Sequence, residues 1–193
     1  KEVCEMNNVD CQTFLVVVNF MAEGFSRMDG SADDISIPAL VDYLRQAHIY
    51  FLDYCLPAIR RKLIEAIDCS QDDVSFLILK FFDGYMREVR KHMEYEEKTV
   101  FKYVDTLIHG NAPKNYQIST FSKHHDQVGE RLTELKNIII KYCPAKANTN
   151  VLNAALFDIY ACEEGLESHC KVEDYLFVPA ILKLERRMRE NEK

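Results

Sequence analysis

The sequence is poor in residues that interrupt helices. Its 193 residues include only six glycines and five prolines, whereas 48% are hydrophobic and 28% are charged. This composition is typical of a soluble helical protein and disfavours an all-β or a disordered one. A chain of this length is enough for one large domain whose hydrophobic core needs no disulfide or bound metal for stability. We expect no second full domain.

The sequence also lacks a hydrophobic segment long enough to cross a membrane. The longest apolar run extends from Phe14 to Phe20 and is interrupted by Asn19. It is much shorter than the roughly 20 apolar residues that a transmembrane helix needs. No segment resembles a signal peptide. We therefore predict no membrane association. Because the sequence opens with Lys1 instead of methionine, we leave open whether the native chain extends beyond either end.

The cysteines form no pair of the type CxxC. They are odd in number and widely spread, at positions Cys4, Cys11, Cys55, Cys69, Cys143, Cys162 and Cys170. Such spacing predicts neither a disulfide framework nor a zinc knuckle. A reducing, cytoplasmic location is therefore expected.

An excess of positive charge is absent as well. The net charge is -7, and no cluster of lysine and arginine lacks neighbouring acidic residues. Phosphate backbones are bound by basic surfaces, so we predict no direct contact with DNA or RNA.

Apolar residues recur at helical spacing through four long stretches. We predict helices over residues 37–67, 73–108, 116–142 and 148–189, with Ser36 as the N-cap of the first and Pro179 kinking or breaking the fourth. A shorter helix is expected over residues 11–25. The short connections favour antiparallel neighbours, so the predicted fold is all-α, an up-down-up-down four-helix bundle. Residues 1–34 are predicted to form an N-terminal helical segment, and residues 35–193 the bundle.

Two segments of the predicted helices share the spacing HxxxE. The first runs from His92 to Glu96, and the second from His169 to Glu173. Spacing of i to i+4 places an imidazole and a carboxylate on one helix face, a turn apart, where both can reach a common ion or a pair of ions. A single pattern of this kind arises often by chance, so support must come from the other histidines.

The remaining histidines have a matching spacing. His48 precedes His92 by 44 residues, and His125 precedes His169 by 44 residues. The midpoint of each interval falls in a predicted turn, so the two histidines of each antiparallel hairpin lie at one level. The midpoint between His92 and His125 falls beside the turn at Gly110. We therefore predict that four histidines and two glutamates converge in one layer of the core.

Six ionisable groups in one buried layer favour a metal site. A lone histidine in a core more often satisfies a polar partner, and a lone glutamate more often faces water. Burying six together without an ion would cost several kcal/mol. Imidazole mixed with carboxylate suits iron or manganese better than structural zinc. The predicted ligands are His48, His92, Glu96, His125, His169 and Glu173.

We expect these ligands to hold two iron ions, with manganese as the alternative metal. Two bridging carboxylates would keep the ions together, and the open positions would admit oxygen, nitric oxide or peroxide. Two isolated mononuclear sites fit the twofold pattern less well. Three other residues are given structural roles: His109 as a helix C-cap, and Cys55 and Cys162, on inward stripes, as small core hydrophobes.

The order of one histidine, an HxxxE, another histidine and a second HxxxE resembles the hemerythrin-like (HHE cation-binding) family. The resemblance covers residues 40–184 and is closest to the di-iron repair-of-iron-centres branch, which uses four histidines and two bridging glutamates. The matching residues are His92 to Glu97 with Val100 and Phe101, His125 and Asp126 with Gly129 and Glu130, and His169 and Glu173 with Leu176, Phe177 and Pro179. Oxygen-carrying hemerythrins have a further histidine where this sequence has Gly129, which disfavours an oxygen carrier.

Residues 3–20 resemble the end of a small amino-terminal domain of the repair proteins, but they lack its adjacent cysteine pair. The resemblance implies a non-haem di-iron protein of the nitrosative or oxidative stress response that repairs iron–sulfur centres, with iron–sulfur proteins as partners. The alternative is a di-iron sensor of oxygen, nitric oxide or redox state that regulates an attached or partner domain. A third is an oxidase or peroxidase. The sequence leaves enzymatic activity and the oligomeric state open, a homodimer included.

Overall fold

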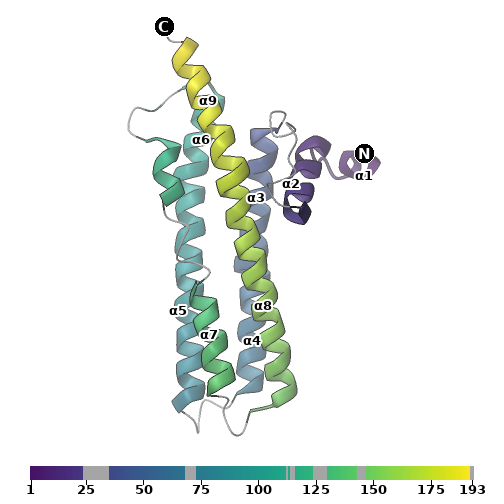
Figure 1. Ribbon diagram of the computed structural model, residues 1–193, viewed down its shortest axis with the longest axis vertical. Coiled ribbons are helices and arrows are strands. Elements are labelled where there is room, and N and C mark those ends of the chain that lie inside the picture. Colours follow the sequence, from purple (N-terminus) through teal and green to yellow (C-terminus); the bar gives the residue numbers. More distant parts are fainter. Residues whose placement is uncertain are drawn as a thin grey trace. The chain divides into compact units, whose positions relative to one another are not determined.

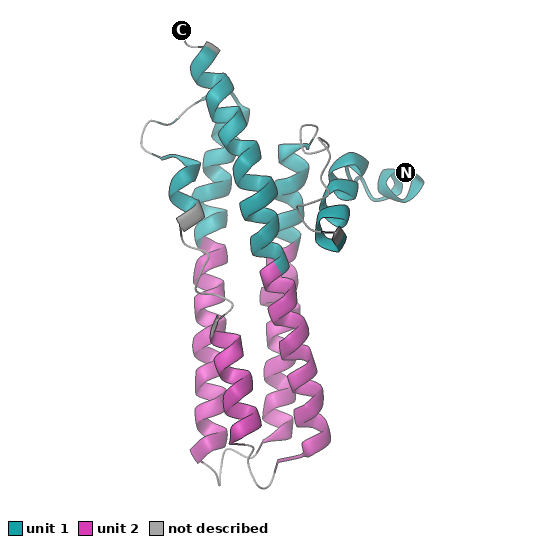
Figure 2. Cartoon of the chain, in the orientation of Figure 1, with its two compact units in different colours: residues 1–46, 95–124, 168–193 teal, residues 47–94, 125–167 magenta. Residues whose placement is uncertain are grey.

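The computed structural model describes residues 1–23, 35–67, 73–111, 113, 116–123, 130–142 and 147–191. Within these residues all regular structure is helical and no strand occurs, which confirms the predicted all-α class. The chain forms two compact units, coloured separately in Figure 2: unit 1 comprises residues 1–46, 95–124 and 168–193, and unit 2 comprises residues 47–94 and 125–167. The predicted boundary between the N-terminal segment and the bundle, at residues 34 and 35, stays a prediction because residues 24–34 lie outside the described ranges.

Three of the four predicted stretches form uninterrupted helices, and each contains a π-helical segment. They are α3 (Ile37–Ile49), η3 (Tyr50–Cys55) and α4 (Leu56–Ala66); α5 (Asp73–Tyr95), η4 (Glu96–Val100) and α6 (Phe101–Ile108); and α8 (Thr149–Val172), η7 (Glu173–Phe177) and α9 (Val178–Asn191) (Figure 1). A π-helical turn is wider than an α-helical one and is frequent at functional sites. Hydrophobic spacing gave no sign of these segments.

The ends of two helices are capped as predicted. The Ser36 hydroxyl accepts a hydrogen bond from the Ala39 N–H at 3.4 Å, at the start of α3. Side chains that accept such bonds satisfy amide groups that have no partner within the helix. His109 is the C-cap of α6, and its Nδ1 lies 2.7 Å from the Asp105 carbonyl oxygen. Both capping predictions are confirmed.

The third stretch differs from its prediction. We expected one helix over residues 116–142, but the described parts are a 3-10 helix, η5 (Ile118–Lys123), and the α-helix α7 (Glu130–Lys141). Ile118 and Phe121, three residues apart, are both fully buried. A 3-10 helix repeats every three residues, so it turns both side chains to the same side. Residues 124–129 lie outside the described residues.

Pro179 does not end the fourth helix. It is the second residue of α9 and follows η7 directly. A proline ring clashes with the carbonyl group four residues earlier, and a widened turn at that point gives it room. Of the two predicted outcomes at Pro179, a break is therefore ruled out, a kink stays a prediction, and the irregularity beside Pro179 is the π-helical segment.

In the described residues before α3 there are two short helices, whereas only one was predicted. The unexpected helix is α1 (Glu2–Met6), and the expected one is α2 (Cys11–Glu23). The Asp10 carboxylate accepts a hydrogen bond from the Thr13 N–H at 2.8 Å and caps α2. The Thr13 hydroxyl in turn accepts a bond from the Ser36 N–H at 3.0 Å. This contact joins α2 to the start of α3 within unit 1.

The core of unit 2 is built from four helical segments with buried stripes. Leu56, Ile59 and Leu63 follow one another at spacings of three and four residues on α4. Comparable stripes on the other segments comprise Ile78, Phe82, Tyr85, Val89 and Met93 of α5, Leu132, Leu135 and Ile139 of α7, and Leu152, Ala155, Ile159, Cys162 and Leu166 of α8. This spacing is that of one helix face, so each segment buries a single stripe.

Contacts within unit 2 give the direction of two neighbours. The Asn148 N–H donates to the Ala66 carbonyl at 2.8 Å, so α8 begins where α4 ends. Farther along the pair, Lys62 forms an ion pair with Asp158. The residue numbers rise on one helix as they fall on the other, so α4 and α8 are antiparallel. On α5, Glu88 pairs with Arg131 of α7, which lies beside α5 (Figure 1).

The core of unit 1 is rich in aromatic rings. Phe101 meets Phe177 edge to face, with ring centroids 5.8 Å apart, and Phe121 approaches Phe177 in the same way at 6.4 Å. Val16 and Phe20 of α2 add to this cluster. Among the described residues, no helix is both long enough and apolar enough to cross a membrane.

Candidate metal centre

The predicted ligands lie in register with the buried stripes of their helices. His48 follows the buried Leu44 by four residues, and Glu96 follows the buried Met93 by three. His169 follows Leu166 by three residues, and Glu173 follows His169 by four. Spacings of three and four keep a side chain on one helix face. The hydrophobic pattern therefore turns these polar residues inward.

Four of the six predicted ligands come together. His48, Glu96, His169 and Glu173 each offer one ligand atom, and these atoms all lie within 4.8 Å of one another. All four side chains are buried, at 3%, 0%, 2% and 0% exposure. Within unit 1, the Nε2 atom of His169 lies 3.4 Å from the Oε1 atom of Glu173. The structure thus supplies imidazole nitrogen and carboxylate oxygen, both buried, at one point.

The two glutamates occupy equivalent backbone positions. Glu96 is the first residue of η4, and Glu173 is the first residue of η7. In each HxxxE segment the α-helix therefore continues through the histidine and widens at the glutamate. Hydrophobic spacing does not predict this widening, although the shared HxxxE pattern marks both places where it occurs.

The remaining two predicted ligands are only partly described. The His92 side chain is half-buried, with its Nε2 atom fully buried, and it lies on α5 one turn before Glu96. His92 is not among the four residues that converge within 4.8 Å. His125 lies outside the described residues, so its role stays a prediction.

The buried carboxylates influence neighbouring acidic groups. Burial raises the pKa of the Cys170 thiol, and the charges of Glu173 and Glu96 raise it further. Burial likewise raises the pKa of the Tyr43 hydroxyl, with Glu173 adding to the effect. Neither Tyr43 nor Cys170 fits the histidine spacing, so neither could be identified from the sequence. In both groups the contribution of the carboxylates comes second to that of burial.

This donor set fits a metal cation. Two fully buried carboxylates close together disfavour each other's charged form, and a cation between ligand atoms reverses that effect. Oxygen and imidazole donors without thiolate suit iron and manganese, whereas structural zinc favours thiolate sets. The group of His48, Glu96, His169 and Glu173 is therefore suited to holding a cation of this class.

Comparison with known proteins agrees with this chemistry. The family model of the hemerythrin HHE cation-binding domain matches residues 39–181, which is most of the chain. The chain belongs to the hemerythrin family. No curated protein gives a significant match to it. All four converging residues fall within the matched range, so in this hemerythrin-family chain the cation-binding region and the buried donor group coincide.

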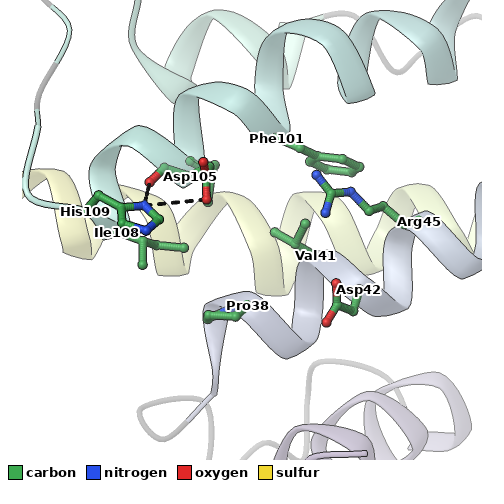
Figure 3. A pocket seen from close by; sticks show the side chains of 9 residues that line it. Pro38, Val41, Asp42, Arg45, Phe101, Asp105, Ile108 and His109 are labelled. Atoms are coloured by element: carbon green, nitrogen blue, oxygen red, sulfur yellow. Dashed lines mark hydrogen bonds and ion pairs between the residues drawn. The ribbon is translucent and has the colours of Figure 1, made fainter.

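The structure also contains an open pocket of about 240 Å³ in unit 1, between α3 and α6 (Figure 3). The Arg45 guanidinium lies over the Phe101 ring, 5.5 Å from its centroid, and pairs with Glu97 at 3.2 Å. At the other end, His109 pairs with Asp105. The lining includes none of the six predicted ligands, so we do not assign metal chemistry to this pocket.

Proposed function

We propose that this hemerythrin-family chain binds two iron ions through His48, His92, Glu96, His125, His169 and Glu173. The observation that carries the proposal is the convergence of two fully buried glutamates and two buried histidines within 4.8 Å. In the proposed architecture, four helices run up-down-up-down, and each contributes one or two ligands to a single layer.

The ligands divide into two roles under this proposal. Glu96 and Glu173, which share a backbone position at the start of π-helical segments, would supply carboxylate oxygens to the ions. The four histidines would supply imidazole nitrogens. Iron bound in this way would supply redox chemistry and open positions for a small diatomic molecule or peroxide. The apolar side chains around the ligands exclude bulk water and limit access to small molecules.

Metal stoichiometry tests this proposal. The full chain is reconstituted anaerobically with ferrous iron, freed of unbound metal and measured by mass spectrometry. We expect about two irons per chain, as dinuclear carboxylate sites in helical bundles hold. Glu96→Gln should lose most of the iron, whereas Glu97→Gln should keep it. Glu97 is the matched control because it adjoins Glu96, is partly exposed and pairs with Arg45. Wild-type protein that takes up no iron would overturn the proposal.

We further propose, from the resemblance to the repair branch, that the iron serves the nitrosative or oxidative stress response by restoring iron–sulfur centres. The alternative is a sensor that reports ligand binding or redox change to another domain. Both uses need the same centre, and they differ in the fate of the metal: repair requires iron to leave, whereas sensing requires it to stay.

Transfer of labelled iron separates the two uses. The chain is loaded with isotopically labelled iron and mixed with an iron–sulfur protein whose cluster has been damaged by nitric oxide. Repair predicts that the label appears in the restored cluster faster than from free iron at equal concentration. Retention of the label by the chain, with a spectral change on addition of nitric oxide, would contradict repair and support sensing.

A further inference from the structure

Two cysteines that are far apart in the sequence form a thiol pair in unit 2. Cys55, the last residue of η3, and Cys162 of α8 are hydrogen-bonded to each other. Both are free thiols. Cys162 is 2% exposed, whereas Cys55 is half-buried and packs against the same core. The interpretation of both as core residues is therefore right, but it missed that they face each other.

Contacts on both sides hold the two cysteines in register. Gly165, three residues after Cys162, faces Phe51, which precedes Cys55 by four residues. A Cβ atom on Gly165 would lie 3.3 Å from the Phe51 ring, so the absence of a side chain makes room for this ring between the two helices. In the other direction along the pair, the ion pair between Lys62 and Asp158 joins the same helices. The cysteines therefore lie on backbones fixed on either side of them.

The two thiols differ in chemical character. Hydrogen bonds from Cys162 and Tyr50 lower the pKa of the Cys55 thiol, although burial acts against them. The bond to Cys55, followed by burial, raises the pKa of the Cys162 thiol. A thiolate is the nucleophilic form of cysteine, and attack requires access from solvent. Cys55 has the lower pKa of the two and is partly exposed, so it is the better placed to attack, whereas the buried Cys162 is suited to react with an oxidised Cys55.

We propose that Cys55 and Cys162 form a redox-active dithiol that hydrogen peroxide oxidises to a disulfide joining η3 to α8. The Cys55 sulfur attacks one peroxide oxygen and the O–O bond breaks. This leaves a sulfenic acid at Cys55 and releases one water after protonation. The Cys162 sulfur then attacks the Cys55 sulfur, the S–S bond forms, and hydroxide leaves with the Cys162 proton as a second water. Two thiols lose two electrons, and one peroxide becomes two waters.

The geometry required for a disulfide is compatible with this place in the fold. A disulfide needs Cα atoms about 4.4–6.8 Å apart, which neighbouring helices reach only where their backbones are close. The hydrogen bond between the Cys55 and Cys162 side chains already brings their sulfur atoms into contact at this level of the two helices. The proposal does not depend on a bound metal, so it can fail or hold independently of the proposed iron centre.

Mapping of disulfides tests the proposal. The full chain is treated with one equivalent of hydrogen peroxide, or with diamide to exclude radicals generated by iron; remaining thiols are alkylated, and peptides are analysed by mass spectrometry. We expect a peptide linked through Cys55 and Cys162. The link should be lost in Cys162→Ser, where Cys55 should instead be trapped by a sulfenic-acid reagent.

A second thiol pair in the chain supplies the matched control. Cys4 and Cys11 are also hydrogen-bonded, in the N-terminal helices. The double variant Cys4→Ser, Cys11→Ser should keep the link between Cys55 and Cys162 in full. Wild-type protein in which Cys55 is overoxidised, joins two chains or stays alkylatable while other thiols oxidise would overturn the proposal. Because these outcomes are read from wild-type protein, a poorly folded variant does not affect the result.

Discussion

The Nε2 atom of His169 lies 3.4 Å from the Oε1 atom of Glu173, one helical turn away, and both side chains are almost completely buried. Burying such a polar pair in a helical core lowers the free energy of unfolding, a cost that proteins commonly carry at binding sites. The stability of the protein with and without metal therefore reports on this site.

Glu96→Gln should act in opposite directions on the two forms. In the metal-free protein it replaces one of two neighbouring buried carboxyl groups with a neutral amide, so the free energy of unfolding should rise by about 1 to 3 kcal/mol. In the presence of iron the variant should lose the stabilisation that ligand binding gives the folded state, about 3 to 4 kcal/mol for metal at a few hundred times Kd. Thermal unfolding with and without iron measures both effects. A variant that is destabilised in both conditions would contradict the account.

His169→Ala should reduce the bound iron by at least half, because it removes a buried donor from the converging group. His109→Ala is the matched control. His109 is an exposed helix cap whose loss should cost about 0.5 to 1 kcal/mol of stability and leave the iron content unchanged. Metal analysis of both variants, with circular dichroism to verify folding, checks the prediction. Equal iron loss in the two variants would count against a specific role for His169.

Tyr103→Phe should destabilise unit 1. The Tyr103 hydroxyl donates to the buried Glu185 carboxylate at 2.5 Å, and the Ile118 N–H donates to the same oxygen at 3.0 Å. Removing one donor from a buried carboxylate costs about 1 to 3 kcal/mol. Tyr95→Phe, which removes an exposed hydroxyl, should change stability by less than about 0.5 kcal/mol. Denaturant unfolding compares the two variants. Equal effects would show that the hydrogen bond from Tyr103 to Glu185 does not stabilise unit 1.

Asp83→Asn should cost stability at neutral pH but not in acid. Arg60 bonds both Asp83 oxygens, at 2.6 and 3.1 Å, and holds the pKa of that carboxyl below its usual value. A folded-state pKa below the unfolded one gives stability that is present above about pH 4 and lost as the pH falls through the folded value. Because the pair is partly exposed, the cost at pH 7 should be about 0.5 to 1 kcal/mol. Unfolding at pH 7 and pH 3 tests this, and an equal cost at both would contradict it.

Much of the fold follows from the spacing of residues in the sequence. The stripe of Ile78, Phe82, Tyr85 and Val89 predicts α5 and its buried face, and the structure has both. The same periodicity, continued through His48, Glu96, His169 and Glu173, explains why the inward placement of these polar residues could be anticipated. Hydrophobic stripes and histidine spacing are properties of helix geometry, so a single sequence reveals them.

Other features depend on backbone detail that spacing does not record. The π-helical segments beginning at Glu96 and Glu173 insert one residue into a turn, a change too small to alter the hydrophobic pattern. The 3-10 helix at Ile118 depends on its bond to Glu185, 67 residues later in the chain. Likewise, the meeting of Cys55 and Cys162 is set by helix packing, because no local motif connects them.

Anomalous diffraction at the iron absorption edge, from crystals of the iron-loaded chain, tests the proposed two-iron centre most directly. We expect two neighbouring iron peaks, both in contact with Glu96 and Glu173, and each with histidine ligands from the predicted set. A single peak, or iron bound only at surface carboxylates with Glu96 and Glu173 free of metal, would contradict it.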